Sequence, residues 1–266
     1  MSSDKRQILN NAHKLLDRGL YDRAIKEYLR IVDMDPSDVF ALQKIAELHS
    51  RNGAHASAVS FYEKSYAVLK SKGFHEKCVA VLKRILELDP GQLDFRYALA
   101  VAQSELGRLE EAGNTLRSLI GLYEKKGERQ QSLRMLKELV RLLPNDWTNR
   151  TRLAEAYSSL GKNILAIETF KEVLAQLLQS DNHQEHDRVA ERVLYLYPDQ
   201  NEIGLALSRS YLAQRKLREA LTWLQVLFKA DPKHPETLEL LGDAFLSQDR
   251  VDKAMAVYRE ARRVLQ

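Results

Sequence analysis

Apolar residues recur along the chain at spacings of three and four, which is the period of amphipathic α-helices and not of strands. Two neighbouring stripes illustrate the pattern: Leu99, Ala100, Gln103 and Leu106, followed by Ala112, Leu116, Leu119 and Ile120. Strands are not indicated anywhere in the sequence. The pattern therefore predicts an all-α protein built from many helices of about 14 residues.

Superimposed on this pattern are two longer periods. Four of the six prolines lie 54 residues apart: Pro36, Pro90, Pro144 and Pro198. Inside that period is a shorter one of 34 residues, marked by alanine, and six segments fit it: 5–38, 39–72, 93–126, 147–180, 201–234 and 235–266. Periods of this length are typical of stacked helical units, in which each unit packs mainly against its neighbours.

The repeated positions have physical explanations. The twentieth residue of all six segments is alanine and the eighth is always small, so the two helices of a segment can approach closely where they cross. The fifteenth residue is glycine in the first four segments, because glycine tolerates the left-handed conformation that ends a helix. The twenty-fourth residue is large and fills space between units: Tyr28, Tyr62, Leu116, Phe170, Leu224 and Tyr258.

These positions resemble those of the tetratricopeptide repeat (TPR) family over about three quarters of the chain. The rest consists of three inserts of 20 residues, 73–92, 127–146 and 181–200. Each insert carries an apolar stripe ended by proline and so predicts one extra helix, like a second TPR helix without its first. We therefore expect one TPR-type α-solenoid over residues 1–266, with about fifteen antiparallel helices and a 54-residue module through its middle.

Two consequences follow from the inserts. The units that precede them lack a closing proline and carry Lys70, Glu124 and Leu178 instead, so their second helices should run on by about one turn. Three helices per module should also make the first helices of successive modules point in alternate directions. A regular TPR array keeps these helices parallel along one groove, so we expect that groove to be interrupted here.

Composition argues against nucleic acid as a partner and against insertion into a membrane. Lys and Arg exceed Asp and Glu by only 41 to 37, with mixed signs, so no nucleic acid is expected as a partner. The single cysteine, Cys78, lies on an apolar stripe and suits a core position in a reducing compartment. A signal peptide and a long apolar run are both missing, which favours a cytoplasmic protein without membrane insertion.

Recognisable catalytic motifs are missing as well, so the chain is expected to be no enzyme and to need no cofactor or metal. One cluster contains residue types that commonly bind metal ions: His183, Glu185, His186 and Asp187. His183 and Asp187 lie one helical turn apart, but acidic residues are favoured at a helix start in any case. We interpret these histidines as structural or surface residues.

The TPR resemblance also indicates where a partner would bind. The Lys and Asn residues that grip a C-terminal carboxylate in chaperone-binding members are missing from the matching positions. Residues at the groove-facing positions are partly apolar and rimmed by charges, which would suit an amphipathic helix or an apolar loop. The candidate binding residues are Phe40, Gln43, Glu47, Tyr97, Val101, Arg152, Glu155, Leu205 and Arg209. The alternative is that the extra helices cover them.

The function expected from this resemblance is a non-catalytic scaffold or adaptor for a protein partner. Segments 73–90 and 127–144 resemble those of bacterial TPR adaptors for a Ras-like small GTPase of cell polarity and type IV pilus motility. Two other readings remain open. One is an RNA-associated helical repeat, and the other is an assembly factor that self-associates through the apolar face of residues 251–266.

Overall fold

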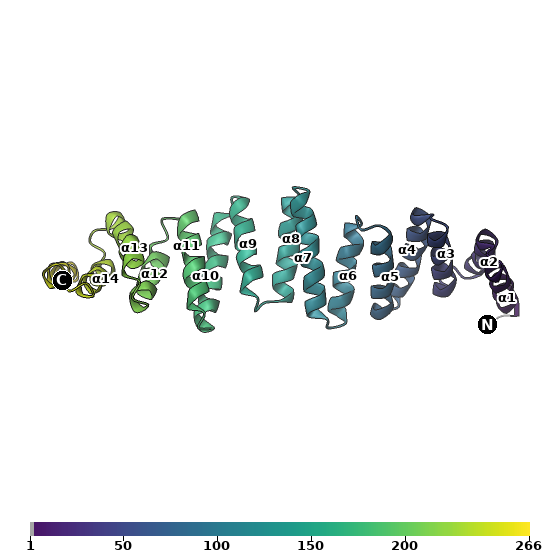
Figure 1. The fold of residues 1–266 in the computed structure, drawn as a ribbon, viewed down its shortest axis with the longest axis horizontal. Coiled ribbons are helices and arrows are strands. Elements are labelled where there is room, and N and C mark those ends of the chain that lie inside the picture. The colour runs from purple at the N-terminus through teal and green to yellow at the C-terminus, as the bar shows by residue number, and fades with distance from the viewer. Residues whose placement is uncertain (1–2) are drawn as a thin grey trace. The chain divides into compact units, whose positions relative to one another are not determined.

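The computed structural model describes residues 3–266, and over this range the chain consists of fifteen α-helices and no strand (Figure 1). This confirms the all-α fold and the number of helices that the sequence predicts. The helices are α1 (Ser3–Asp17), α2 (Tyr21–Met34), α3 (Val39–Arg51), α4 (His55–Ser71), α5 (His75–Leu88), α6 (Leu93–Glu105), α7 (Leu109–Lys125), α8 (Arg129–Leu142), α9 (Trp147–Ser159), α10 (Asn163–Gln179), α11 (His183–Leu196), α12 (Asn201–Ala213), α13 (Leu217–Ala230), α14 (Pro235–Leu246) and α15 (Val251–Val264).

The chain divides into two compact units, Met1–Pro144 and Asn145–Gln266. The first contains α1 to α8 and the second α9 to α15. Within each unit the main packing contacts join helices that are consecutive in the chain, and α12 also packs against α14. In the described range no helix is both long enough and apolar enough to cross a membrane.

The helices that precede an insert are longer than their counterparts. α4, α7 and α10 each have 17 residues, whereas α2 and α13 have 14 and end next to an Asp-Pro pair. Proline lacks an amide hydrogen and clashes with the preceding turn, so a helix stops before it. Where the proline is missing, the second helix continues for the extra turn that the sequence predicts.

The extra helices α5, α8 and α11 join their modules through the same kind of turn that joins the first helix to the second. At Gly73 the backbone is left-handed, with φ of 70°. The Gly73 amide donates to the Lys70 carbonyl at 3.1 Å and the Phe74 amide to the Leu69 carbonyl at 3.0 Å, which is a Schellman motif. Gly127 and Asp181 repeat this turn after α7 and α10.

Burial follows the small positions of the repeat. The alanines at the twentieth position are at most 1% exposed in all six segments: Ala24, Ala58, Ala112, Ala166, Ala220 and Ala254. Five of the six large side chains at the twenty-fourth position are also buried, with Tyr28 and Phe170 fully enclosed, and Tyr258 is partly buried. Cys78 lies in the core of the first unit beside Leu82 and Ile85, where burial raises the pKa of its thiol.

Helix direction alternates within each unit. Three reversals, each made by a loop of three or four residues, separate α3 from α6, so these two first helices run in opposite directions (Figure 1). The same number of reversals separates α9 from α12 in the second unit. First helices of neighbouring three-helix modules therefore do not form one parallel row within a unit.

The left-handed turns give a direct test of this architecture. A Cβ at Gly127 would meet nothing within 4 Å, so Gly127→Ala should destabilise the protein only through its φ of 73°, by about 1 kcal/mol. Gly121→Ala, inside α7 and equally uncrowded, is the matched control and should stabilise by about 0.5–1 kcal/mol. Urea unfolding followed by circular dichroism measures both, and equal effects of the two substitutions would contradict the turn.

Candidate functional site

The first three-helix module, α3–α4–α5, encloses a cleft of about 390 Å³ between α3 and α5, with Tyr62 of α4 at its floor. Its lining residues are Glu47, Ser50, Arg51, Tyr62, Arg84, Glu87 and Leu88. Charges dominate this surface. Lys44 and Glu47 form an ion pair of 2.8 Å along α3, and Arg84 and Glu87 form another of 2.8 Å along α5.

Burial and these charges affect the pKa of Tyr62. Burial raises the pKa of its phenol, and the nearby carboxylate of Glu47 raises that pKa further. The hydroxyl therefore stays protonated over the whole physiological range. The first cleft thus offers a neutral aromatic floor between two internally paired, polar walls.

The second module, α6–α7–α8, has a cleft of about 420 Å³ between α6 and α8, with Leu116 of α7 at its floor. It is lined by Tyr97, Ala100, Val101, Ser104, Glu105, Leu109, Leu116, Glu138, Arg141 and Leu142. Most of these side chains are apolar, and Val101 is 41% exposed. The polar residues lie on the rim, where Glu138 and Arg141 form an ion pair of 2.8 Å.

The two clefts are equivalent by the repeat. Every residue that lines the first has a counterpart 54 positions later that lines the second. The pairs are Glu47 and Val101, Ser50 and Ser104, Arg51 and Glu105, Tyr62 and Leu116, Arg84 and Glu138, Glu87 and Arg141, and Leu88 and Leu142. We call this feature the module cleft. The same backbone arrangement carries different side chains in the two modules, and the ion pair on its extra helix is reversed in sign.

In the third module, α9–α10–α11, the equivalent surface is bridged. Arg192 of α11 donates from Nε to Glu155 of α9 at 3.1 Å, across the position where the other two modules have their clefts. Phe170 lies fully buried at the floor position. Tyr195, which is 77% exposed, lies beside Arg192, whose guanidinium carbon is 5.8 Å from the ring centre.

The predicted binding residues are distributed over these modules. Glu47 lines the first cleft, Tyr97 and Val101 line the second, and Glu155 makes the ion pair of the third. Tyr97 and Val101 come together in one cavity. Arg152 lies half-buried on α9.

The remaining predicted residues lie outside the module clefts that the structure describes. Phe40 is 48% exposed and packs edge-on against Tyr28, with ring centres 6.3 Å apart. Gln43 donates to the Ser65 hydroxyl at 3.2 Å. Arg209 of α12 pairs with Glu236 of α14 and also lines a cleft of about 380 Å³ beside α11.

Leu205, which the groove assignment includes, is buried in the core of the second unit with Leu224 and Leu240. It therefore contributes to packing between α12, α13 and α14 rather than to a surface. Its position in the segment matches that of Gln43 and Tyr97, so the difference comes from the neighbour: α14 packs directly against α12.

The walls supplied by the extra helices were missed in the sequence analysis. Arg84 and Glu87 on α5, and Glu138 and Arg141 on α8, form one wall of the first and second cleft respectively. Groove-facing positions of a two-helix repeat include only first-helix residues. The 54-residue spacing held the missing signal, because charged pairs recur at the same place in both inserts.

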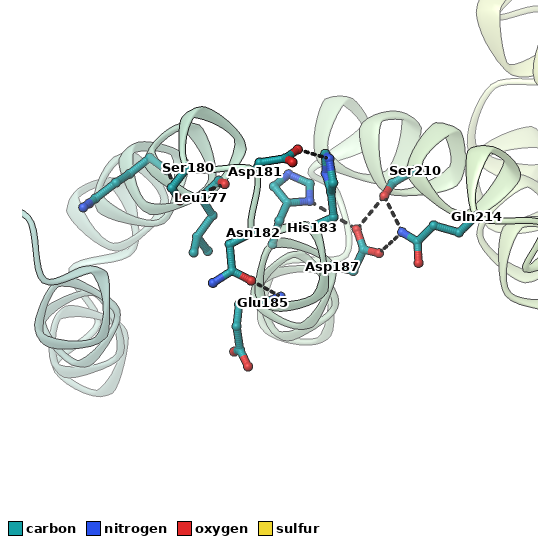
Figure 2. Close-up of polar contacts among 11 residues, drawn as sticks. Leu177, Ser180, Asp181, Asn182, His183, Glu185, Asp187, Ser210 and Gln214 are labelled. Atoms are coloured by element: carbon teal, nitrogen blue, oxygen red, sulfur yellow. Dashed lines mark hydrogen bonds and ion pairs between the residues drawn. The ribbon is translucent and has the colours of Figure 1, made fainter.

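Residues of the histidine-rich segment form a hydrogen-bonded network with residues 210 and 214 (Figure 2). Asp187 is 4% exposed and accepts hydrogen bonds from Ser210 Oγ of α12 at 2.8 Å and from Nε2 of Gln214, the residue that follows α12, at 2.6 Å. Its Oδ1 also lies 3.2 Å from His186 Nδ1. His183 turns the other way, toward Asp181 at 2.8 Å. Within residues 3–266 no three His, Cys, Asp or Glu side chains converge as metal ligands.

Comparison with known proteins identifies the repeat. Family models described as tetratricopeptide repeat match residues 9–73 and 205–264 in one version and residues 76–134 in another, together more than half of the chain. None of the curated proteins compared with the chain matches it.

Three solved structures illustrate the structural matches. The TPR domain of P58(IPK) has 15% identity and a TM-score of 0.31, with 98% of this chain and 93% of that chain covered. YrrB, described as a TPR protein with an unusual peptide-binding site, has 16% identity and a TM-score of 0.33, with 89% and 91% covered. PilF of Pseudomonas aeruginosa has 14% identity and a TM-score of 0.34, with 98% and 91% covered. These scores are too low to bear on the function of this chain.

The Asp187 network predicts a contrast between neighbouring residues. Asp187→Ala should lower the free energy of unfolding by about 1–3 kcal/mol, because Ser210 and Gln214 lose their acceptor between α11 and α12. His183→Ala, at an exposed position of the same helix, should change it by less than about 0.5 kcal/mol. Thermal unfolding with and without added Zn²⁺ measures both effects. A Zn²⁺-dependent rise in Tm that His183→Ala abolishes would overturn the structural interpretation.

Proposed function

The chain belongs to the tetratricopeptide repeat family, and we propose that it works as a non-catalytic scaffold that binds a protein partner through the first-helix side of its three-helix modules. TPR repeats typically form interaction scaffolds and not catalytic centres. The observation that carries the proposal is the exposure of large apolar side chains on the first helices of two modules, one of which lines a cleft. Phe40 and Val101 are each more than two fifths exposed, on α3 and α6 respectively.

Such side chains are costly to leave in water and are common anchors of protein interfaces. The charged residues around them favour a specific interface over non-specific hydrophobic association. Lys44 lies over the Phe40 ring, with Nζ 5.8 Å from the ring centre, and Glu47 pairs with Lys44. Aromatic side chains rimmed by charges are typical of the centres of binding surfaces.

The finer form of the proposal concerns the partner. Segments 73–90 and 127–144 resemble those of bacterial adaptors for a Ras-like GTPase of cell polarity and motility, so a small GTPase is the folded partner to look for first. In that case the nucleotide would belong to the partner, and this chain would recognise the partner's switch surface.

The test is affinity capture from a lysate of the organism's own cells, with quantitative mass spectrometry. Tyr97→Ala and Phe40→Ala should each weaken capture of the same partner by at least about fivefold, since aromatic anchors contribute disproportionately to binding. Gln131→Ala is the control, because Gln131 is exposed on α8 and does not line either module cleft. Helicity by circular dichroism must be unchanged in all three. Equal capture by all variants would contradict binding through this side.

A second candidate function is self-association through α15. Val251 and Met255 of α15 are 53% and 48% exposed, although the other face of this helix is packed on α14, and Leu265, which follows α15, is 65% exposed. A second copy of the chain could cover this apolar surface.

Sedimentation at rising protein concentration tests the second candidate. The wild-type chain should shift to a faster-sedimenting species, and Met255→Glu should remain monomeric because a buried, unpaired carboxylate would oppose the contact. Val226→Glu introduces the same charge at an exposed apolar position on α13 and is the matched control. A wild-type chain that stays monomeric throughout would rule out self-association.

A further inference from the structure

We propose that the module cleft of α6–α7–α8 is an anchoring pocket for one large apolar side chain of an amphipathic partner helix that carries a lysine or arginine one turn away. The proposal rests on the proposed scaffold function and names the chemistry that the scaffold would recognise. It concerns only the first compact unit, in which all lining residues lie.

The floor of the cleft is the first argument. The equivalent position holds Tyr62 in the first module and Phe170 in the third, and both rings are buried. Leu116 is smaller than either aromatic, so the floor of the second module is aliphatic, and its cleft of about 420 Å³ is slightly larger than the 390 Å³ of the first. Apolar cavities bind apolar groups well, because water gains few hydrogen bonds there and the walls lack packing partners.

The wall of the cleft is the second argument. Val101 stands where Glu47 and Glu155 stand in the other modules. In the third module the glutamate is bridged by Arg192 at 3.1 Å, which ties the first helix to the extra helix. Valine cannot form such a bridge, so α6 and α8 stay unlinked at this point. The cleft therefore remains open, with Val101 and Leu109 both more than two fifths exposed.

The rim selects the charge of the partner. Two carboxylates, Glu105 and Glu138, face one guanidinium, Arg141, which is already paired with Glu138. Glu105 makes no ion pair with any described residue. The rim therefore has one uncompensated negative charge, which favours a cationic side chain over an anionic one. In the first module Glu47 and Glu87 are balanced by Arg51 and Arg84, so no such preference arises.

The dimensions fit a helix. From Tyr97 to Glu105 the cleft follows α6 for two turns, about 12 Å, so an apolar residue over Leu116 and a basic residue one turn away both lie within it. A partner helix presents residues i and i+4 on one face at that spacing.

The experiment uses three alanine-based helical peptides as probes and ¹⁵N amide shifts of the full chain as readout. The first carries Trp with Lys four residues later, the second Trp with Glu there, and the third Ala with Lys. The first peptide should shift the amide signals of α6, α7 and α8. It should bind at least about threefold more tightly than the second peptide. The third peptide should not bind. Shifts that map to other helices, or equal binding of all three peptides, would overturn the proposal.

The repeat itself supplies the first variant. Leu116→Phe puts at the floor the larger ring that Phe170 provides in the third module. It should weaken binding of the first peptide by about tenfold or more. Val101→Lys replaces part of the apolar wall with a positive charge that opposes the lysine of the peptide, so it should weaken binding by a similar factor. Tyr62→Leu makes the opposite change in the first module and should leave binding to α6–α8 unchanged. Undiminished binding by a folded Leu116→Phe or Val101→Lys would overturn the pocket.

The two proposals fail in different ways. If the peptides do not use the cleft but cellular capture still depends on Tyr97 and Phe40, the scaffold stands and the pocket falls. If capture is insensitive to both aromatic residues while the peptides bind as described, the pocket stands and the wider first-helix surface falls.

Discussion

The close crossing of the first and second helices of each unit is the constraint on which the rest of the structure depends. Alanine occupies the twentieth position in all six segments and is buried each time. At the last crossing, Gly242 faces Tyr258, and a Cβ on the glycine would lie 2.3 Å from the ring. Helices that cross this closely keep the same relation from unit to unit, so every outward position falls at a predictable place.

The extra helices add a third element without disturbing that crossing. Loss of a closing proline lengthens α4, α7 and α10, and a left-handed residue then turns the chain into α5, α8 and α11. Both steps repeat devices already used elsewhere in the chain. The new feature is the module cleft, which exists because a first helix and an extra helix flank the same second helix.

Local chemistry made most of the fold predictable. Helix number, the extra turn before each insert and the turns at Gly19, Gly53, Gly107 and Gly161 all follow from spacing, proline and glycine. At Arg215 and Asp249 the chain adopts the same left-handed turn without glycine, with φ of 60° and 57°. The position in the repeat decides the conformation there, at a modest cost in strain.

The candidate site was less predictable, because exposure depends on neighbours that are distant in sequence. Leu205 and Tyr97 occupy the same position of their segments, yet one is enclosed by α14 and the other lines an open cleft. The family pattern contains no extra helix, so it could not assign a role to Arg84 or Glu138. Only the comparison of modules, 54 residues apart, reveals them as equivalent walls.

Within this chain, the residues that hold the helices together differ from the residues that vary on the surface of each module. The buried alanines hardly vary between modules, whereas the cleft changes from charged to apolar to bridged. Since all three modules rest on the same crossing, packing at the crossing does not require these differences. The proposed burial of the apolar second cleft by a partner would account for a valine where its equivalents are glutamate.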